Sequence, residues 1–169
     1  MGGLDGKHQN IDDVFHKIDL PFAVTLYGHA SKTVWVTDNG MMCLDSHTDA
    51  RAHRFGMALP AHHGIPPYAV FPYWTDLMIS AGKPHGIYYE IDGPVGKRQL
   101  TVEWYVTRYK HEEQYFHFTV ELSEAHPNVV TFKYYDVGDK THESTVGVQG
   151  PKGKFLKIPF HSAYPSRTD

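Results

Sequence analysis

Apolar and polar residues alternate along much of the chain between residues 86 and 149. In segments 100–108 and 114–122 every second residue is apolar, and turn signals separate such segments by about ten residues. The inward set that this alternation predicts is Leu100, Val102, Trp104, Val106, Phe116, Phe118, Val120 and Leu122, followed by Val130, Phe132 and Tyr134. Because successive side chains of a strand point to opposite faces, the pattern predicts antiparallel strands with one face in a core.

The first half of the chain also carries strand and turn signals. Phe22, Val24 and Leu26 alternate with smaller or polar residues, and Asn39-Gly40 predicts a hairpin turn because both residues tolerate positive φ. No segment keeps an apolar stripe at helical spacing over several turns, so we expect no long helix. The predicted fold is therefore all-β, an antiparallel β-sandwich of roughly nine to eleven strands.

The chain is expected to form one domain. Residues 1–12 are polar and rich in glycine and are predicted to be a flexible N-terminal arm, residues 13–160 form the β-sandwich, and residues 161–169 form a C-terminal tail. A domain of this size buries roughly 70% of its unfolded surface, so it needs neither a metal nor a disulfide to fold. The single cysteine, Cys43, lies in an apolar strand and is expected to be a buried, inert thiol.

Charge and hydropathy narrow the classes of partner. The net charge is −3 with histidine neutral, which gives no electrostatic case for nucleic-acid binding. No apolar run approaches the roughly 20 residues of a membrane span, so no membrane insertion is expected. Residues 1–6 lack a basic region followed by an apolar stretch, which is not the pattern of a signal peptide, so a cytoplasmic location stays open beside a secreted one.

The polar segment 45–63 interrupts the strand pattern and contains several of the thirteen histidines. A long loop is uncommon unless it is functional or packed by its own side chains. Asp45, His47 and Asp49 would share a face if extended, and with His53 or His62 they could complete a metal site. This set supports an alternative function, a metal-dependent or hydrolytic enzyme that uses the histidine-rich loop.

The competing interpretation of this loop is a solvated polar segment that binds no metal. Adjacent side chains such as His62 and His63 rarely converge on one ion, and no histidine spacing matches a zinc protease or a zinc finger. No Gly-x-Ser-x-Gly segment that would present a nucleophilic serine occurs in the sequence. We therefore expect no metal and no cofactor and assign no catalytic residue. The sequence does not decide whether the chain is an enzyme, but it favours a protein without catalytic activity.

Aromatic residues gather on the strand faces that point away from the predicted core. Tyr105, Tyr115 and His117 alternate with inward residues and are expected to share one outer face. Two interpretations are open: simple cross-strand packing, or a platform on which a sugar or a peptide stacks, a role that suits amphipathic rings. Under the second interpretation these three residues bind the ligand, and His62 and His63 of the loop add titratable donors.

Two acidic residues, Glu103 and Glu121, occupy the same outer face. Carboxylates on neighbouring strands could form a glycosidase pair, but such residues more often pair with lysine or arginine across the strands. We therefore interpret Glu103 and Glu121 as surface residues with cationic partners rather than as a catalytic pair.

A series of short motifs follows the predicted strands in order. The series is Leu20-Pro21-Phe22, Leu26-Tyr27-Gly28, Val34–Gly40, Leu59-Pro60, Val70–Leu77, Gly86–Tyr89, Val102-Glu103-Trp104, Phe132-Lys133-Tyr134 and Thr145–Gln149. Over about residues 14–150 this order resembles the nidogen-like β-sandwich modules of extracellular and secreted proteins. Tyr73 stands where phenylalanine is usual there, and Thr75 where aspartate is frequent, which weakens any expectation of a cation site in that segment.

The resemblance implies structural rather than catalytic roles for the shared residues, with Trp74 as a large buried anchor. The leading hypothesis is a non-catalytic recognition or adhesion module with a glycan or protein ligand, extracellular or secreted as part of a larger protein. Its oligomeric state is not indicated by the sequence. The enzyme that uses loop 45–63 is the alternative, and a purely structural spacer is a third hypothesis.

Overall fold

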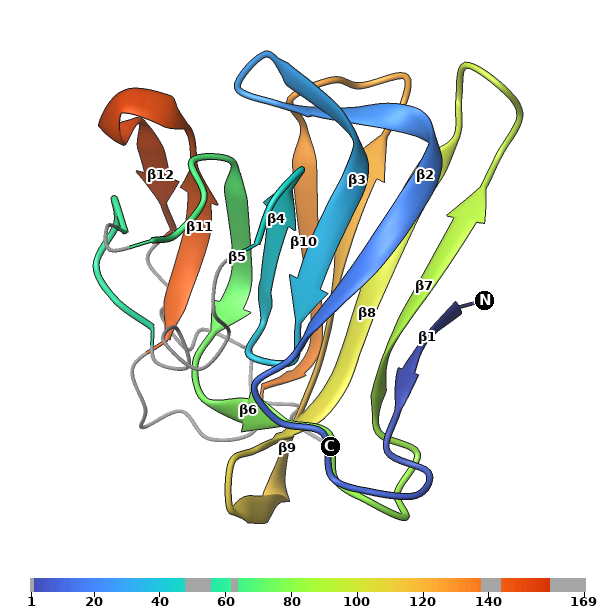
Figure 1. The fold of residues 1–169 in the computed structure, drawn as a ribbon, viewed down its shortest axis with the longest axis vertical. Coiled ribbons are helices and arrows are strands. Elements are labelled where there is room, and N and C mark those ends of the chain that lie inside the picture. The colour runs from blue at the N-terminus through green and yellow to red at the C-terminus, as the bar shows by residue number, and fades with distance from the viewer. Residues whose placement is uncertain (1, 48–55, 62–63, 138–143, 159–169) are drawn as a thin grey trace, which may run out of the picture.

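Two antiparallel sheets face each other in the computed structural model, which describes residues 2–47, 56–61, 64–137 and 144–158 (Figure 1). The first sheet has the strand order β1-β7-β8-β9-β10, with β6 paired to β8, and the second has the order β12-β11-β5-β4-β3-β2. The strands are β1 (Gly2–Asp5), β2 (Phe15–Leu26), β3 (His29–Thr37), β4 (Met41–Leu44), β5 (Ala69–Trp74), β6 (Leu77–Met78), β7 (Gly86–Asp92), β8 (Gln99–Arg108), β9 (His111–Ser123), β10 (Val130–Val137), β11 (Thr145–Gln149) and β12 (Phe155–Lys157). The predicted all-β antiparallel sandwich is confirmed.

The main core lies between the two sheets. The inward residues that alternation predicts on β8 and β9, from Leu100 to Leu122, are all buried, and the prediction of their face is confirmed. Opposite them the second sheet contributes Ile18, Val34, Val36 and other apolar residues. The sheets therefore meet through the apolar face of each strand, while the polar residues of β8 and β9 form the outer face of the first sheet.

The N-terminal residues differ from the sequence expectation. Residues 2–5, which we assigned to a flexible arm, form β1 at the edge of the first sheet and pair with β7. Glycine makes this close pairing possible, because a Cβ on Gly3 would lie 2.1 Å from the main-chain oxygen of Ile87. Glycine-rich sequence is usually taken as a signal of flexibility, and here it permits close approach of two strands.

The described residues form twelve strands rather than nine to eleven. Strand β1 lies in the segment that we assigned to the arm, β6 has two residues and β12 has three. Segments such as β1 and β6 are too short to show a period of two, so sequence alternation does not reveal them.

A second, smaller core lies against the second sheet, on the face that points away from the first sheet. It contains Trp74 stacked on Phe71, with ring centroids 4.9 Å apart, together with Met41, Cys43, Leu59, Ala61, Ile65 and Ala69. Trp74 is therefore buried as the resemblance implies, but in this satellite cluster and not between the sheets. Strands β4 and β5 are consequently buried on both faces, which explains their continuous apolar sequence.

Side chains of β11 hold the segment that covers this second core. The Gln149 amide accepts a hydrogen bond from Ala61 N–H at 2.6 Å and donates one to the Ala61 carbonyl at 3.0 Å. Thr145 Oγ1 donates to the Met57 carbonyl at 2.6 Å. The polar residues of the closing Thr145–Gln149 motif thus tie residues 57–61 to the sheet.

The hairpin predicted at Asn39-Gly40 is confirmed between β3 and β4. Gly40 has φ of 70°, and a Cβ there would lie 2.2 Å from the Tyr73 carbonyl oxygen. The buried Asn39 side chain accepts a hydrogen bond from Leu77 N–H at 2.8 Å and donates one to the Asp13 carboxylate at 3.1 Å. The turn therefore also joins β6 and the segment before β2.

Candidate functional site

The outer face of the first sheet carries a cluster of aromatic side chains. We call this the tyrosine face and define it by Tyr88, Tyr105, Tyr115, His117 and Tyr135. Strand pairing places Tyr105 of β8 opposite His117 of β9, and Thr107 of β8 opposite Tyr115 of β9. The expectation that Tyr105, Tyr115 and His117 share one face is therefore confirmed; their role in ligand binding stays a prediction.

The rings of the tyrosine face contact one another across three strands. The ring centroids of Tyr105 and Tyr115 are 6.1 Å apart at an edge-on angle, and those of Tyr105 and His117 are 5.2 Å apart. His117 in turn packs on Tyr135 of β10 at 4.5 Å. Tyr115 is 42% exposed and Tyr135 is 56% exposed, so the row of rings is open to solvent.

Sequence reasoning did not place Tyr88 and Tyr135 in this group. Both follow the same alternation, because each is adjacent to an inward or partly buried neighbour in its strand. Their position beside Glu103 and His117 depends on strand register, in which Tyr88 lies opposite Glu103. Alternation identifies the face that a residue occupies, whereas its neighbours across the sheet depend on strand pairing.

Carboxylates surround the rings. Glu103 lies 2.7 Å from His117 Nε2, and Glu121 forms an ion pair with Lys133. Glu121 thus has a lysine partner as predicted, whereas the partner of Glu103 is a histidine and not the lysine or arginine that the sequence led us to expect. Glu90 is exposed and has no ion-pair partner among the residues that the structure describes.

Two tyrosines of this face have a raised pKa. The Tyr115 pKa is raised by the charge of Asp136 and by a hydrogen bond to it. Burial raises the Tyr88 pKa, and the charges of Asp5 and Glu103 add to the effect. The Tyr115 shift indicates a negative electrostatic potential beside that ring, whereas the Tyr88 shift comes mainly from burial.

A small pocket of about 180 Å³ opens on the tyrosine face, and we call it the acidic pocket. It is lined by Tyr88, Tyr89, Glu90, Thr101, Glu103, Thr119 and Tyr135. Thr119 is only 4% exposed, and its Oγ1 has no hydrogen-bond partner in the part of the chain that the structure describes. A buried hydroxyl of this kind is uncommon in folded proteins and calls for an explanation.

The histidine-rich loop is described only in part. Asp49, His62 and His63 lie outside the described residues, as does the rest of 48–55. The Asp45 carboxylate contacts Ser31 and His29, whereas His47 packs its ring on Trp35 at 4.1 Å. The two described members of the alternative metal set therefore have different partners.

Ser31, His29 and Asp45 meet in one group, but not in the order that nucleophilic catalysis needs. The Asp45 carboxylate lies between the other two, accepting a hydrogen bond from Ser31 Oγ and contacting His29 Nε2. An activated serine instead has its hydroxyl bonded directly to the histidine base. The His29 ring is stacked on Tyr68, with centroids 4.1 Å apart.

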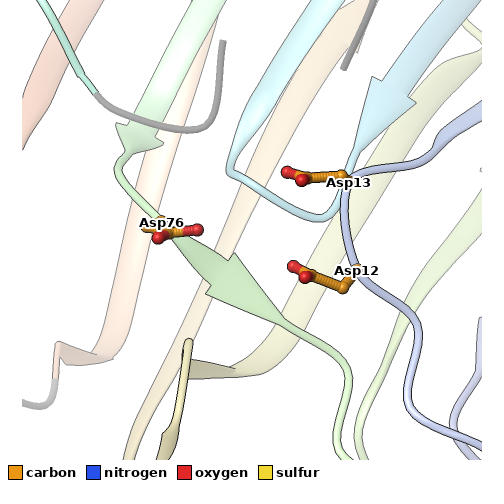
Figure 2. Close-up of side chains that lie close together, drawn as sticks. All are labelled: Asp12, Asp13 and Asp76. Carbon is orange, nitrogen blue, oxygen red and sulfur yellow. The ribbon is translucent and has the colours of Figure 1, made fainter. Parts of the chain in front are cut away.

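Three aspartates come together at the end of the sandwich near the β3–β4 turn (Figure 2). Carboxylate oxygens of Asp12, Asp13 and Asp76 lie within 4.8 Å of one another. The Asp38 carboxylate lies nearby and accepts hydrogen bonds from the main-chain N–H groups of Asp13 and Val14 at 3.0 and 2.9 Å. Burial raises the pKa of Asp38 to about 7, and the charge of Asp12 contributes.

Sequence reasoning missed this acidic group. Asp12 and Asp13 fall at the boundary between the expected arm and the domain, far along the chain from Asp76. The expectation that Thr75 weakens a cation site considered only the acids of its own segment. The group consists of oxygen donors alone, the donor type that hard cations such as Ca²⁺ prefer.

An apolar groove of about 450 Å³ lies at another edge of the molecule. Its lining includes Tyr27, Val129, Phe132, Leu156 and Ile158, and three of these apolar side chains are more than a third exposed. Residues from 159 onward lie outside the described part of the chain, so the structure does not show what covers the groove.

Comparison with protein families gave one match: a family model described as NIDO related matches residues 3–169. Searches of curated proteins and of solved structures gave no match. Within the described part of the chain, no helix has the length and hydropathy that a membrane crossing requires.

Proposed function

The chain belongs to the NIDO-related family, and from this premise we propose that it is a non-catalytic recognition module of an extracellular or secreted protein, whose ligand binds on the tyrosine face. The extracellular location follows the resemblance to nidogen-like modules. The site follows the arrangement of the aromatic side chains. Glycan and protein ligands both use exposed aromatic platforms of this kind.

The observation that supports this proposal is the row of solvent-exposed rings. Tyr115, Tyr105, His117 and Tyr135 are in contact across β8, β9 and β10, yet they belong to the face opposite the core. Single exposed aromatics are common, but a contiguous group suits a binding surface. Tyrosine offers a large contact area, a polar hydroxyl and few rotatable bonds, so ordering it on binding has a low entropic cost.

The main core does not include these rings. The main core uses the opposite side chains of the same strands, including Val102, Trp104 and Phe118. A purely structural spacer would have no need for adjacent exposed tyrosines at these positions. The enzyme alternative receives no support from the described residues, because Asp45 and His47 have separate partners.

Glycan and peptide arrays test the proposal. The wild-type domain should bind a subset of wells, and Tyr105→Ala should reduce that signal about tenfold or more, as loss of a central aromatic contact does. Phe155→Ala is the control, because Phe155 is 44% exposed on β12 of the other sheet. An absence of binding in every well would favour the spacer, and equal loss in both variants would place the site elsewhere.

A further inference from the structure

The acidic pocket has features that general aromatic stacking does not explain. Tyr88 of β7, Glu103 of β8 and Thr119 of β9 lie opposite one another in one row across the sheet. Glu90 and Thr101 form the adjacent row. The lining of the pocket thus combines three tyrosines, two carboxylates and two threonines within a small volume.

Charge in the pocket favours a cationic ligand. Glu90 and Glu103 line it, whereas no lysine or arginine does. Of the two neighbouring groups that can carry positive charge, Lys133 pairs with Glu121, whereas His117 contacts Glu103 itself at 2.7 Å. Glu90 is the pocket carboxylate that has no ion-pair partner among the described residues. Phosphate or carboxylate groups would be repelled here, while a cation beside tyrosine rings and carboxylates gains from both.

Size favours a single side chain. A volume of about 180 Å³ is below the roughly 300–1,000 Å³ of pockets that enclose small-molecule ligands. Arginine fits better than lysine, because its planar guanidinium stacks on aromatic rings and offers five N–H donors to several acceptors at once.

Thr119 provides an independent observation that points to a ligand. Thr119 lines the pocket, and its Oγ1 is buried beneath the pocket surface with no hydrogen-bond partner among the described residues. A buried hydroxyl without a partner is destabilising, and an N–H donor that enters the pocket would relieve that cost once rotation of the Thr119 side chain turns its hydroxyl toward the donor.

From these features we infer that the acidic pocket binds the guanidinium group of an arginine side chain presented by a protein partner. This inference rests on the proposed recognition function and specifies its ligand class. Tyr88 and Tyr135 would flank the guanidinium plane, Glu90 and Glu103 would accept its N–H groups, and Thr119 Oγ1 would accept one more. Nearby Tyr105 and Tyr115 would contact the partner around this anchor.

Amide NMR titrations with three small probes test the inference. The probes are N-acetyl-arginine amide, N-acetyl-lysine amide and N-acetyl-citrulline amide, the last being a neutral analogue of arginine with nearly the same shape. The arginine probe should shift the amide signals of the residues that line the pocket. The citrulline probe should bind about tenfold more weakly or worse, because charge-assisted hydrogen bonds are lost, and lysine should lie between.

Single substitutions test whether the arginine probe binds in the acidic pocket. Glu90→Gln should weaken the arginine probe about tenfold while preserving the fold, since Glu90 is exposed. Thr119→Val keeps the side-chain shape and removes the hydroxyl, so it should weaken binding about threefold without lowering the melting temperature. Asp19→Asn is the control, because it removes one exposed carboxylate from β2 of the other sheet and should leave binding unchanged.

Several results would overturn the inference. They are equal binding of citrulline and arginine, equal losses in Glu90→Gln and Asp19→Asn, or signal shifts away from the pocket. If the arrays show a ligand that depends on Tyr105 while the arginine probe fails to bind, the recognition function stands and the arginine inference is wrong. If the arginine probe binds and Glu90→Gln weakens that binding about tenfold while Asp19→Asn leaves it unchanged, the inference is supported.

Discussion

The Trp104 indole Nε1 donates a hydrogen bond of 2.8 Å to the main-chain oxygen of Thr37. Trp104 belongs to β8 of the first sheet and Thr37 to β3 of the second, so this bond joins the two halves of the sandwich. The indole ring is fully buried and stacks on Phe118, with centroids 5.4 Å apart. Trp104 thus combines apolar packing with a polar contact that fixes the position of one sheet on the other.

Trp104→Ala should lower the free energy of unfolding by about 3–5 kcal/mol, as truncation of large core aromatics does. Denaturant melts of the variant and the wild type measure the loss. Trp104→Phe keeps much of the ring volume and removes the hydrogen bond to Thr37, so its loss should be smaller. A loss below about 1 kcal/mol for the alanine variant would contradict the assignment of Trp104 to the core.

Gln149→Ala should destabilise the domain by about 2–4 kcal/mol. The change leaves the buried N–H and carbonyl groups of Ala61 without their partners, and each unsatisfied group costs about 1–3 kcal/mol. Gln99→Ala is a matched control on a half-buried glutamine whose hydrogen bond to Thr101 is long at 3.3 Å. Equal effects in the two variants, measured by thermal melts, would show that Gln149 does not hold the covering segment.

Asp38 should make the domain less stable as pH rises. Burial raises its folded-state pKa to about 7 from 3.8, so between these values the native state holds a proton that the unfolded state has released. The stabilising contribution is therefore complete below about pH 4 and is lost as pH rises through about 7. Asp38→Asn removes this dependence.

The measurement is the unfolding free energy of wild type and Asp38→Asn at pH 5 and pH 8. The decrease from pH 5 to pH 8 should be smaller in the variant, by on the order of 2–3 kcal/mol. Asp38→Asn also removes one acceptor for the N–H groups of Asp13 and Val14, which changes the absolute stability. For this reason the two proteins are compared by how much their unfolding free energy changes with pH. The same decrease in both proteins would show that Asp38 is not the group responsible.

Much of the fold could be predicted from alternation alone, because β8 and β9 each bury one face and expose the other. The second core could not, since its cover is held by contacts such as Gln149 with Ala61, 88 positions apart in the chain. Strand β1 was hidden by glycines that usually indicate flexibility. In each of these cases, the sequence pattern does not show which segment, distant along the chain, packs against the segment in question.

The same limit applies to the candidate site. Tyr105, Tyr115 and His117 could be assigned to one face from their spacing within β8 and β9. The acidic pocket could not, because it needs the register that sets Tyr88 against Glu103 and Thr119. The acidic group of Asp12, Asp13 and Asp76 likewise arises only from the packing of segments far apart in sequence.

We expect the domain to fold without metal and to bind no zinc tightly. The test is metal analysis of protein purified without an affinity tag, together with a melt in the presence of a chelator. His47→Ala and His62→Ala serve as the diagnostic variants. One equivalent of zinc that disappears in either variant would contradict this prediction and support the enzyme alternative, in which Asp45, His47, Asp49 and His62 bind metal.

The most direct test of ligand recognition by the tyrosine face compares two variants, each with three substitutions, on the glycan and peptide arrays. One replaces Tyr105, Tyr115 and Tyr135 with serine, and the other replaces the exposed apolar residues Val95, Val129 and Phe155 with serine. Circular dichroism and melting curves check that both fold. We expect the tyrosine variant to lose binding in every positive well and the control to keep it; retained binding in the tyrosine variant, or loss in the control alone, would contradict the account.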